Sequence, residues 1–367
     1  MDFELDDDQH ALQEVVRDLV DNECPPELVR AVVEGRDDGS GLWKTLVEAE
    51  WPGLTVPEED GGTGASAVEL VIALEELGRG ADPTPFLATT SQFVPLVRSA
   101  DPDLRHELLL AVCDGGSGTV AFAADEVTAR GEGDQWVLSG TARHVIDGDR
   151  ADEVAVIARH DDGVGVFVVS SGDLTAQRTK TFDASFHLAD VTLEGVVVPV
   201  GRSAIGSEVA VAVETARYEA VTGLAATMVG ACQRVLELVL VHIKDRHQFG
   251  VPIGSFQAVK HLAVDAFVSI QRGRALCQYA ALTLAEGDER AGTAASMAKV
   301  AAGDCQRLVS RHGIQLFGGL GYTWENDLQL YVRRAKVGEP LLGKSALHRA
   351  RVARDTIAAQ TATEVPS

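Results

Sequence analysis

The sequence is poor in three features by which several classes of protein are recognised: paired cysteines, positive charge and histidines at ligand spacing. Its five cysteines are scattered over 367 residues without a C-x-x-C pair, so we expect reduced structural cysteines in a reducing cytoplasm. Lys and Arg total 32 against 55 Asp and Glu, a formal net charge of -23. Nucleic acids and anionic membranes require clustered positive charge, so neither is an expected partner. The ten histidines show no ligand spacing, and we predict no metal site.

Long hydrophobic runs are also missing. No apolar stretch reaches the roughly 20 residues that a membrane helix needs. The acidic N-terminal segment MDFELDDDQH has no basic region before an apolar one, so a secretory signal is not expected. A cytoplasmic protein without membrane insertion is the resulting expectation. The apolar content of 46% is typical of a globular chain, and the length allows two or three domains.

The hydrophobic pattern changes twice along the chain. Residues 1–116 show helical periodicity, residues 117–203 contain short β-branched runs between Gly/Asp turns, and helical periodicity returns over 204–360. Residues 361–367 form a polar tail. The pattern predicts an α+β protein: an N-terminal helical domain, a small antiparallel β-barrel or sandwich, and a C-terminal bundle of antiparallel helices.

One segment imitates a nicotinamide-binding motif. Residues 62–67, GTGASA, match the G-x-G-x-x-A fingerprint and precede a predicted helix. The fingerprint requires a strand immediately before it, within a βαβ unit. Here Pro52 and Pro57 interrupt the preceding run, and the following segments are helical. We therefore do not predict a Rossmann domain.

The most informative stretch is residues 246–261, RHQFGVPIGSFQAVKH. It separates two long apolar-periodic segments, which predicts a helix, a tight turn and a second helix. Arg246 precedes the turn, and Gln257 begins the second helix. An arginine fork beside a helix N-terminus can hold a pyrophosphate group. By composition alone, Arg246 could equally be a solvated surface residue.

A second block resolves that ambiguity by resemblance. Residues 315–322, QLFGGLGY, are followed by YVRRAK at 331–336. Together with R-x-x-F-G and I-x-x-F-Q, this block resembles acyl-CoA dehydrogenases over nearly the whole chain. The resemblance implies their fold and their cofactor, FAD. It also implies that one subunit helps to hold the adenosine-pyrophosphate half of its neighbour's flavin through these residues: Arg246, Phe249, Gln257, Gln315, Gly318 and Gly319.

The resemblance also implies a carboxylate base, which removes the α-proton of an acyl-CoA thioester while the flavin takes the β-hydride. The family places this base at either of two positions. In this sequence Leu342 occupies one and Ala220 the other. Glu219 is one residue out of register, which on a helix is ~100° of rotation. It is the candidate base if an irregular turn redirects it. Otherwise we expect a surface glutamate paired with Arg217 or Arg234.

The β-domain departs from the family where the flavin ring should be contacted. The T-E-P-x-x-G-S-D-like loop is replaced by residues 123–130, AADEVTAR. The W-I-T-N-G-like segment reads HVIDG, with His144 in place of the aromatic and Asp147 near the threonine and asparagine. The half of the site facing the flavin ring is altered, whereas the half serving a neighbour is retained. This asymmetry resembles the actinobacterial steroid side-chain dehydrogenases, which pair two unlike subunits as an α2β2 tetramer.

Three hypotheses follow. The chain is a dehydrogenase subunit that needs a base-carrying homologous partner, with electron-transfer flavoprotein as the expected acceptor. Alternatively, it is a self-sufficient homotetrameric dehydrogenase using Glu219. In the third hypothesis it is a non-catalytic acyl-CoA-binding or scaffold protein that keeps the fold. The pyrophosphate clamp formed by Arg246 and Gln257 argues against the third.

Overall fold

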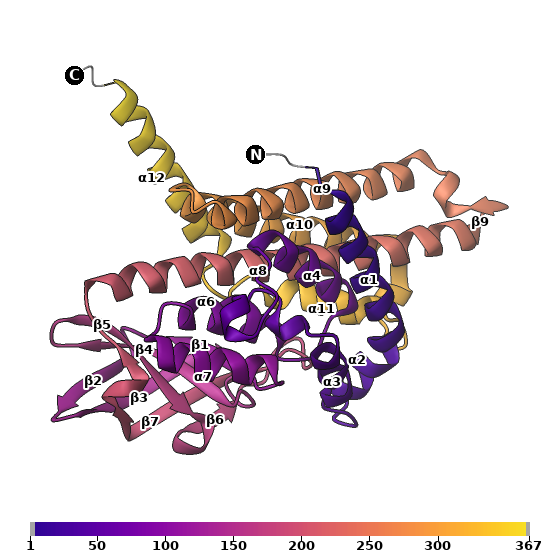
Figure 1. The fold of residues 1–367 in the computed structure, drawn as a ribbon. Helices are drawn as coiled ribbons and strands as arrows, with labels where there is room; N and C mark the ends of the chain where they lie inside the picture. Colours follow the sequence, from indigo (N-terminus) through magenta and orange to yellow (C-terminus); the bar gives the residue numbers. More distant parts are fainter. Residues whose placement is uncertain (1–3, 365–367) are drawn as a thin grey trace. The chain divides into compact units, whose positions relative to one another are not determined.

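The structure, a computed structural model, describes residues 4–364 and confirms the predicted α+β order of helices, strands and helices (Figure 1). It divides into two compact units that do not follow the chain order. The helical unit contains the described residues up to Ala31, residues 67–82 and the described residues from Val221 onward. The mixed unit contains residues 32–66 and 83–220.

Long helices build the helical unit, and apolar and small residues bury their facing sides. The helices are α1 (Asp7–Glu23), α2 (Pro26–Val33), α4 (Ala67–Gly80), α9 (Gln257–Ala285), α10 (Ala291–Phe317), α11 (Leu328–Val337), α12 (Ser345–Glu364) and the later part of α8 (Ser207–Asp245). The capping box of Asp6 and Gln9 begins α1. Alanines let α9 and α10 pack closely, since Ala266, Ala280, Ala298 and Ala302 are all buried.

Glycines bring α4 and α8 into unusually close contact. A Cβ on Gly230 would lie 1.8 Å from the carbonyl oxygen of Glu75, and one on Gly78 would lie 2.3 Å from that of Thr227. Buried carboxylates of α4 are neutralised beside this crossing. Glu76 pairs with Arg17 at 2.6 Å and with Arg79 at 2.8 Å. The crossing therefore combines close backbone packing with a buried ionic network.

The mixed unit is organised around an eight-stranded sheet in the order β6-β7-β3-β2-β4-β5-β8, with β1 paired to β4. The strands are β1 (Gly118–Phe122), β2 (Val127–Glu132), β3 (Gln135–Ile146), β4 (Glu153–His160), β5 (Gly163–Ser170), β6 (Thr175–Arg178), β7 (Leu188–Pro199) and β8 (Ser203–Ala204). Its short helices are α3 (Ser40–Glu48), α5 (Phe86–Ala88), α6 (Val94–Val97) and α7 (Pro102–Cys113). One apolar core lies within the sheet around Leu138 and Phe167. A second joins α6 and α7 to β4, β5 and the start of α8.

Some details differ from the sequence prediction. The sheet is not wholly antiparallel, because β1 and β2 both run parallel to β4. The polar strands β2 and β6 were not predicted, since their exposed residues dilute the hydrophobic pattern. Residues 361–364 of the predicted tail continue α12, where Thr361 donates to the Ile357 carbonyl at 2.9 Å. The tail residues 365–367 lie outside the described chain.

The segment that imitates a dinucleotide motif follows two 3₁₀ turns, Trp51–Gly53 and Glu58–Asp60, and precedes α4. No strand lies directly before it, and so the Rossmann geometry is absent from these described residues. The helix α8 is long and apolar enough to cross a membrane by composition, although no comparable run was expected from the sequence. Because 67% of that apolar window is buried inside the structure, α8 is a core helix.

Candidate active site

The segment after α8 forms a tight hairpin. β9 (His247–Gln248) pairs with β10 (Val251–Pro252), and the two residues between them have positive φ: 54° at Phe249 and 83° at Gly250. This is the signature of a type I′ turn. Glycine adopts that conformation freely, but a bulky residue is strained in it. The Phe249 side chain is nevertheless 93% exposed, with only an edge contact to Phe256 at 6.2 Å.

The N-terminus of α9 lies directly after this hairpin. Gln257 is the first residue of the helix, and the preceding Phe256 supplies no side-chain cap. The Arg246 carbonyl accepts from the Ile253 amide at 2.8 Å, which closes the base of the hairpin. First-turn amides without a side-chain cap, near an exposed guanidinium, form a positive region that suits a phosphate group.

The second sequence block lies at the same end of the helical unit. The Phe317 ring stacks on His242, four residues before Arg246, with centroids 4.3 Å apart. His312 forms a hydrogen bond with the Leu262 carbonyl at 3.2 Å, which ties α10 to the first turns of α9. The structure therefore brings the two blocks together, although about 60 residues separate them in sequence.

The glycines of this block are open to close approach. Gly318 ends α10 with φ 62°, and no atom lies within 4 Å of a Cβ built on Gly318 or Gly319. Gln315, one turn earlier, is exposed. The positive region, two glutamine side chains and an uncovered backbone fit an anionic dinucleotide such as FAD. All six predicted cofactor residues are exposed in this single chain.

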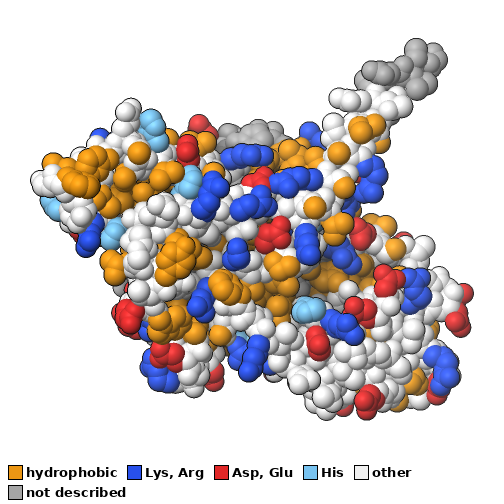
Figure 2. Space-filling model, turned by 180° about the vertical axis from the view of Figure 1, so that it is seen from behind, with side chains coloured by type: hydrophobic (Ala, Val, Ile, Leu, Met, Phe, Trp, Pro, Cys, Tyr) orange, Lys and Arg blue, Asp and Glu red, His pale blue; other side chains and the backbone are white. Residues whose placement is uncertain are grey.

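Exposed apolar side chains surround these residues. Figure 2 shows hydrophobic side chains gathered at the end of the helical unit that carries the hairpin. We call this set the hairpin-end surface: Phe249, Val251, Phe256, Leu320 and Tyr322, which are between 39% and 93% exposed. Monomeric proteins seldom leave such a patch uncovered, so it has the character of an interaction surface.

Leu342 lies in the loop between α11 and α12, in the helical unit. Its φ is 52°, its carbonyl contacts His348 Nε2 at 3.0 Å, and its side chain is partly buried. The buried Lys299 Nζ donates to the carbonyls of Gly338 at 2.7 Å and Glu339 at 3.0 Å. Burial lowers the pKa of Lys299 to about 8. Sequence reasoning did not find Lys299, because its partners are backbone atoms about 40 residues away.

Glu219 belongs to the mixed unit, and its contacts differ from those expected. It is not a surface glutamate: its side chain is only 10% exposed. Neither expected arginine is its partner, since Arg217 lies 3.6 Å from Glu214 and Arg234 lies 3.3 Å from Glu237. Its carboxylate instead accepts from both terminal nitrogens of Arg98.

The Arg98–Glu219 pair is long for a bidentate contact, at 3.3 and 3.4 Å. Burial raises the pKa of the Glu219 carboxyl, and Arg98 offsets this in part. The helix α8 is continuous from Ser207 to Asp245, and no irregular turn near Glu219 redirects its side chain. Glu219 therefore stays about 100° around the helix from Ala220.

The altered segment of the β-domain has an unusual backbone. His144 lies in a β-bulge of β3 with φ 56° and is exposed. Asp147 also has φ 56°, but its side chain is buried and pairs with Arg150 at 2.5 Å. Burial raises the pKa of the Asp147 carboxyl, while Arg150 opposes that rise. Asp147 is therefore engaged within its own unit.

Comparisons with known proteins agree with this architecture. The model of the acyl-CoA dehydrogenase C-terminal domain matches residues 209–357, and that of the N-terminal domain matches residues 6–116. Acyl-CoA dehydrogenase IpdE2 of Mycolicibacterium smegmatis is 33% identical over 344 residues, 92% of this chain and 96% of that protein.

Two solved structures are similar over nearly their whole length. A chain of the ChsE4-ChsE5 complex from Mycobacterium tuberculosis is 28% identical, with a TM-score of 0.89 over 100% of both chains. A chain of the Tcur3481-Tcur3483 steroid acyl-CoA dehydrogenase is 30% identical, with a TM-score of 0.86 over 97% of this chain and 99% of that one. This chain belongs to the acyl-CoA dehydrogenase family, whose members are FAD-dependent oxidoreductases.

Proposed function

We propose that this chain is one subunit of a heteromeric FAD-dependent acyl-CoA dehydrogenase and completes the cofactor site of a homologous partner. The observation that carries the proposal is the side chain at each base position. Leu342 and Ala220 cannot accept a proton, and the nearest carboxylate, Glu219, is paired with Arg98. The partner subunit then supplies the carboxylate that removes the α-proton of the thioester.

In this arrangement the residues of the hairpin end bind and orient the cofactor. Arg246 and the first-turn amides of α9 hold the pyrophosphate, since both present N–H donors where positive potential is highest. Gln257 and Gln315 donate to neighbouring oxygens, and Gly318 and Gly319 leave room for the nucleotide. Bound FAD supplies the hydride acceptor. Phe249 and the rest of the hairpin-end surface pack against the partner and exclude water.

The relatives support a heteromer and suggest the substrate class. ChsE4 and ChsE5 form a complex, and the Tcur3481-Tcur3483 pair is a steroid dehydrogenase. We infer a bulky acyl-CoA derived from a steroid as the substrate, an α2β2 assembly in the cytoplasm, and electron-transfer flavoprotein as the electron acceptor.

A self-sufficient enzyme using Glu219 is the second candidate. It would require Glu219 to leave Arg98 and turn ~100° around a regular helix. The raised pKa of the Glu219 carboxyl suits a general base, and for this reason the self-sufficient enzyme is retained as the second candidate. It differs from the subunit hypothesis in one measurable respect: a lone chain would bind FAD and turn over.

The test is expression of this chain alone and together with a base-carrying homologue. We expect the lone chain to be colourless, and the complex to carry one FAD per pair of unlike chains and to oxidise acyl-CoA. Stoichiometric FAD in the lone chain would overturn the subunit proposal. Absence of FAD and turnover in the complex as well would favour a scaffold.

Two variants in the active complex sharpen the result. Glu219→Gln should leave kcat within about twofold of the parent complex, whereas loss of a true base costs ~10²–10⁴-fold. Arg246→Ala should weaken FAD retention by at least ~tenfold, because a bidentate phosphate contact is lost. Arg354→Ala is its control, since Arg354 is an exposed arginine of α12 that pairs with Asp355. Equal FAD loss in both arginine variants would refute the clamp.

A further inference from the structure

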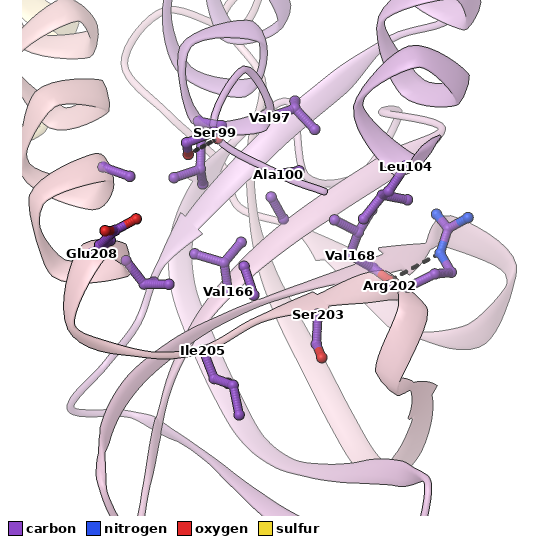
Figure 3. A pocket seen from close by; sticks show the side chains of 15 residues that line it. Val97, Ser99, Ala100, Leu104, Val166, Val168, Arg202, Ser203, Ile205 and Glu208 are labelled. Atoms are coloured by element: carbon purple, nitrogen blue, oxygen red, sulfur yellow. Dashed lines mark hydrogen bonds between the residues drawn. The ribbon is translucent and has the colours of Figure 1, made fainter. Parts of the chain in front are cut away.

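The mixed unit contains a cavity of about 210 Å³ that no step above uses. It lies between the ends of α6 and α7, the strands β4, β5 and β8, and the first turns of α8. Figure 3 shows Val97, Leu104, Val166, Val168 and Ile205 lining it. Most of the wall is therefore hydrocarbon, and the cavity adjoins the core that joins α6 and α7 to the sheet.

Small side chains keep this space open. Four alanines face it: Ala100 from the turn between α6 and α7, and Ala155, Ala204 and Ala212 from β4, β8 and α8. Larger apolar residues at any of these positions would fill the void, which is the usual state of a protein core. A cavity of ~150 Å³ with apolar walls stays dry and takes up benzene, so this larger one has room for a ring of about eight carbons.

Polar groups on the wall are almost all satisfied within the chain. Ser99 Oγ donates to the Leu96 carbonyl at 2.8 Å, and Ser203 Oγ donates to the Val200 carbonyl at 2.8 Å. Arg202 donates to the Val168 carbonyl and pairs with Glu107 and Glu153, at 3.1 and 2.7 Å. The two serine hydroxyls are therefore used as donors, and two carboxylates neutralise the Arg202 guanidinium.

The carboxylate of Glu208 is the exception among the described residues of the wall, since no interaction engages it there. Arg202 is already paired with Glu107 and Glu153, and Glu208 adds a third carboxylate on the α8 side of the cavity. The local charge is therefore negative, which disfavours a fatty acid or a CoA thioester. A hydroxyl group, by contrast, can donate a hydrogen bond to Glu208.

The cavity faces a different side of α8 from the one that carries the family's base position. Glu208 and Ala212 are four residues apart and share a stripe of the helix. Ala220 lies eight residues beyond Ala212, which is ~12 Å along the axis and ~80° around it. A ligand in the cavity is thus separate from the reacting atoms, and its binding does not depend on the proposed subunit role.

We propose that this cavity is a second ligand site, which binds a neutral alicyclic alcohol. The hydrocarbon ring occupies the apolar space between Val97, Val166 and Ala212, and the hydroxyl donates to Glu208. The cavity volume limits the size of the ring, and the Glu208 carboxylate repels anionic analogues.

The site can be tested by titration calorimetry on the purified full chain, with cyclooctanol and cyclooctanecarboxylate as probes. We expect cyclooctanol to bind with one-to-one stoichiometry and the carboxylate at least ~tenfold more weakly. Glu208→Ala should reduce the difference in affinity between the alcohol and the carboxylate, because it removes both the hydrogen-bond acceptor and one repelling charge. A carboxylate that binds as tightly as the alcohol, or no binding of either probe, would overturn the proposal.

A cavity-filling variant locates the binding. Ala212→Leu should weaken cyclooctanol at least ~tenfold, while Val211→Leu should not, because Val211 is on the same helix but 68% exposed. Ala100→Val fills the opposite wall and serves if Ala212→Leu does not fold. Unchanged affinity in a folded filling variant would place the alcohol elsewhere and refute the site.

Discussion

Lys299 provides the sharpest physical prediction. Its ammonium group is fully buried in the helical unit and donates to two backbone carbonyls, those of Gly338 and Glu339. Burial lowers its pKa from the ordinary 10.5 to about 8, although the nearby Glu339 opposes the change. The neutral amine keeps two N–H groups, so deprotonation preserves both hydrogen bonds while removing the cost of burying a charge.

The sign of the pH dependence follows from proton binding. Between pH 8 and 10.5 the unfolded chain holds the Lys299 proton more tightly than the folded chain does. The free energy of unfolding therefore rises with pH across this window because of Lys299. The pKa difference corresponds to ~3 kcal/mol in total, of which ~2 kcal/mol should be gained by pH 10.

Lys299→Met removes both the charge and the donors. Near pH 7 the loss of the hydrogen bonds destabilises the variant, while removal of a buried charge stabilises it. The free energies of unfolding of variant and parent should therefore differ by only ~1–2 kcal/mol. At pH 10 the free energy of unfolding of the variant should be lower than that of the parent by a further ~2 kcal/mol, since only the parent gains stability between pH 7 and pH 10.

Urea unfolding followed by circular dichroism at fixed protein concentration, from pH 7 to pH 10, measures this difference. The control is Lys336→Met, which removes an exposed lysine of α11 and should give a pH-independent offset. If the Lys299→Met and parent curves run parallel over the whole range, the lowered pKa and the reasoning built on it are wrong.

Three other changes test the packing of the helical unit. Gly230→Ala should lower the free energy of unfolding in urea by ~3 kcal/mol or more, because the new Cβ would overlap the Glu75 carbonyl. Gly41→Ala is the control: no atom lies within 4 Å of its Cβ, and the change should be neutral or stabilising. Glu76→Gln should cost ~1–3 kcal/mol, since it removes a buried carboxylate that pairs with Arg17 and Arg79, although Arg79 keeps Asp21 and Glu237; no measurable change would contradict this. Asp6→Ala removes the N-terminal cap of α1 and should cost ~1 kcal/mol, seen as faster amide exchange in its first turn.

Local features of the chain could be predicted from sequence because they depend on neighbours. The change from helical periodicity to β-branched runs and back was sufficient for the architecture, since hydrophobic spacing reflects which side of each element is buried. The turn after Arg246, although not its β-hairpin form, was likewise predicted, because Gly250 tolerates positive φ and Pro252 fixes its own φ. The strands β2 and β6 consist mostly of exposed residues, and their hydrophobic spacing therefore did not predict a strand.

Long-range ion pairs were beyond sequence reasoning. Glu219 was assigned to arginines on its own helix, but its partner Arg98 is 121 residues away. Arg274 and Glu75 pair across 199 residues. Such contacts depend on how the helices pack. From the sequence alone, any of the chain's many arginines could supply the positive charge that pairs with a given glutamate. Only the fold selects among them.

The hairpin end gives the strongest physical reason to expect a bound partner. Phe249 has a left-handed backbone that costs ~1–2 kcal/mol for a residue with a Cβ, and its ring gains almost no burial within this chain. The first turn of α9 lacks a side-chain cap, and Gly318 leaves its surroundings empty. The first two features cost stability in the isolated subunit, whereas the positive φ of Gly318 favours glycine there. Local rules are broken in this way mainly at functional sites, where the compensating interactions form on binding. A scaffold without cofactor would gain from replacing Phe249 and from a side-chain cap on α9, whereas a subunit that holds a neighbour's pyrophosphate requires the exposed ring and the free amides.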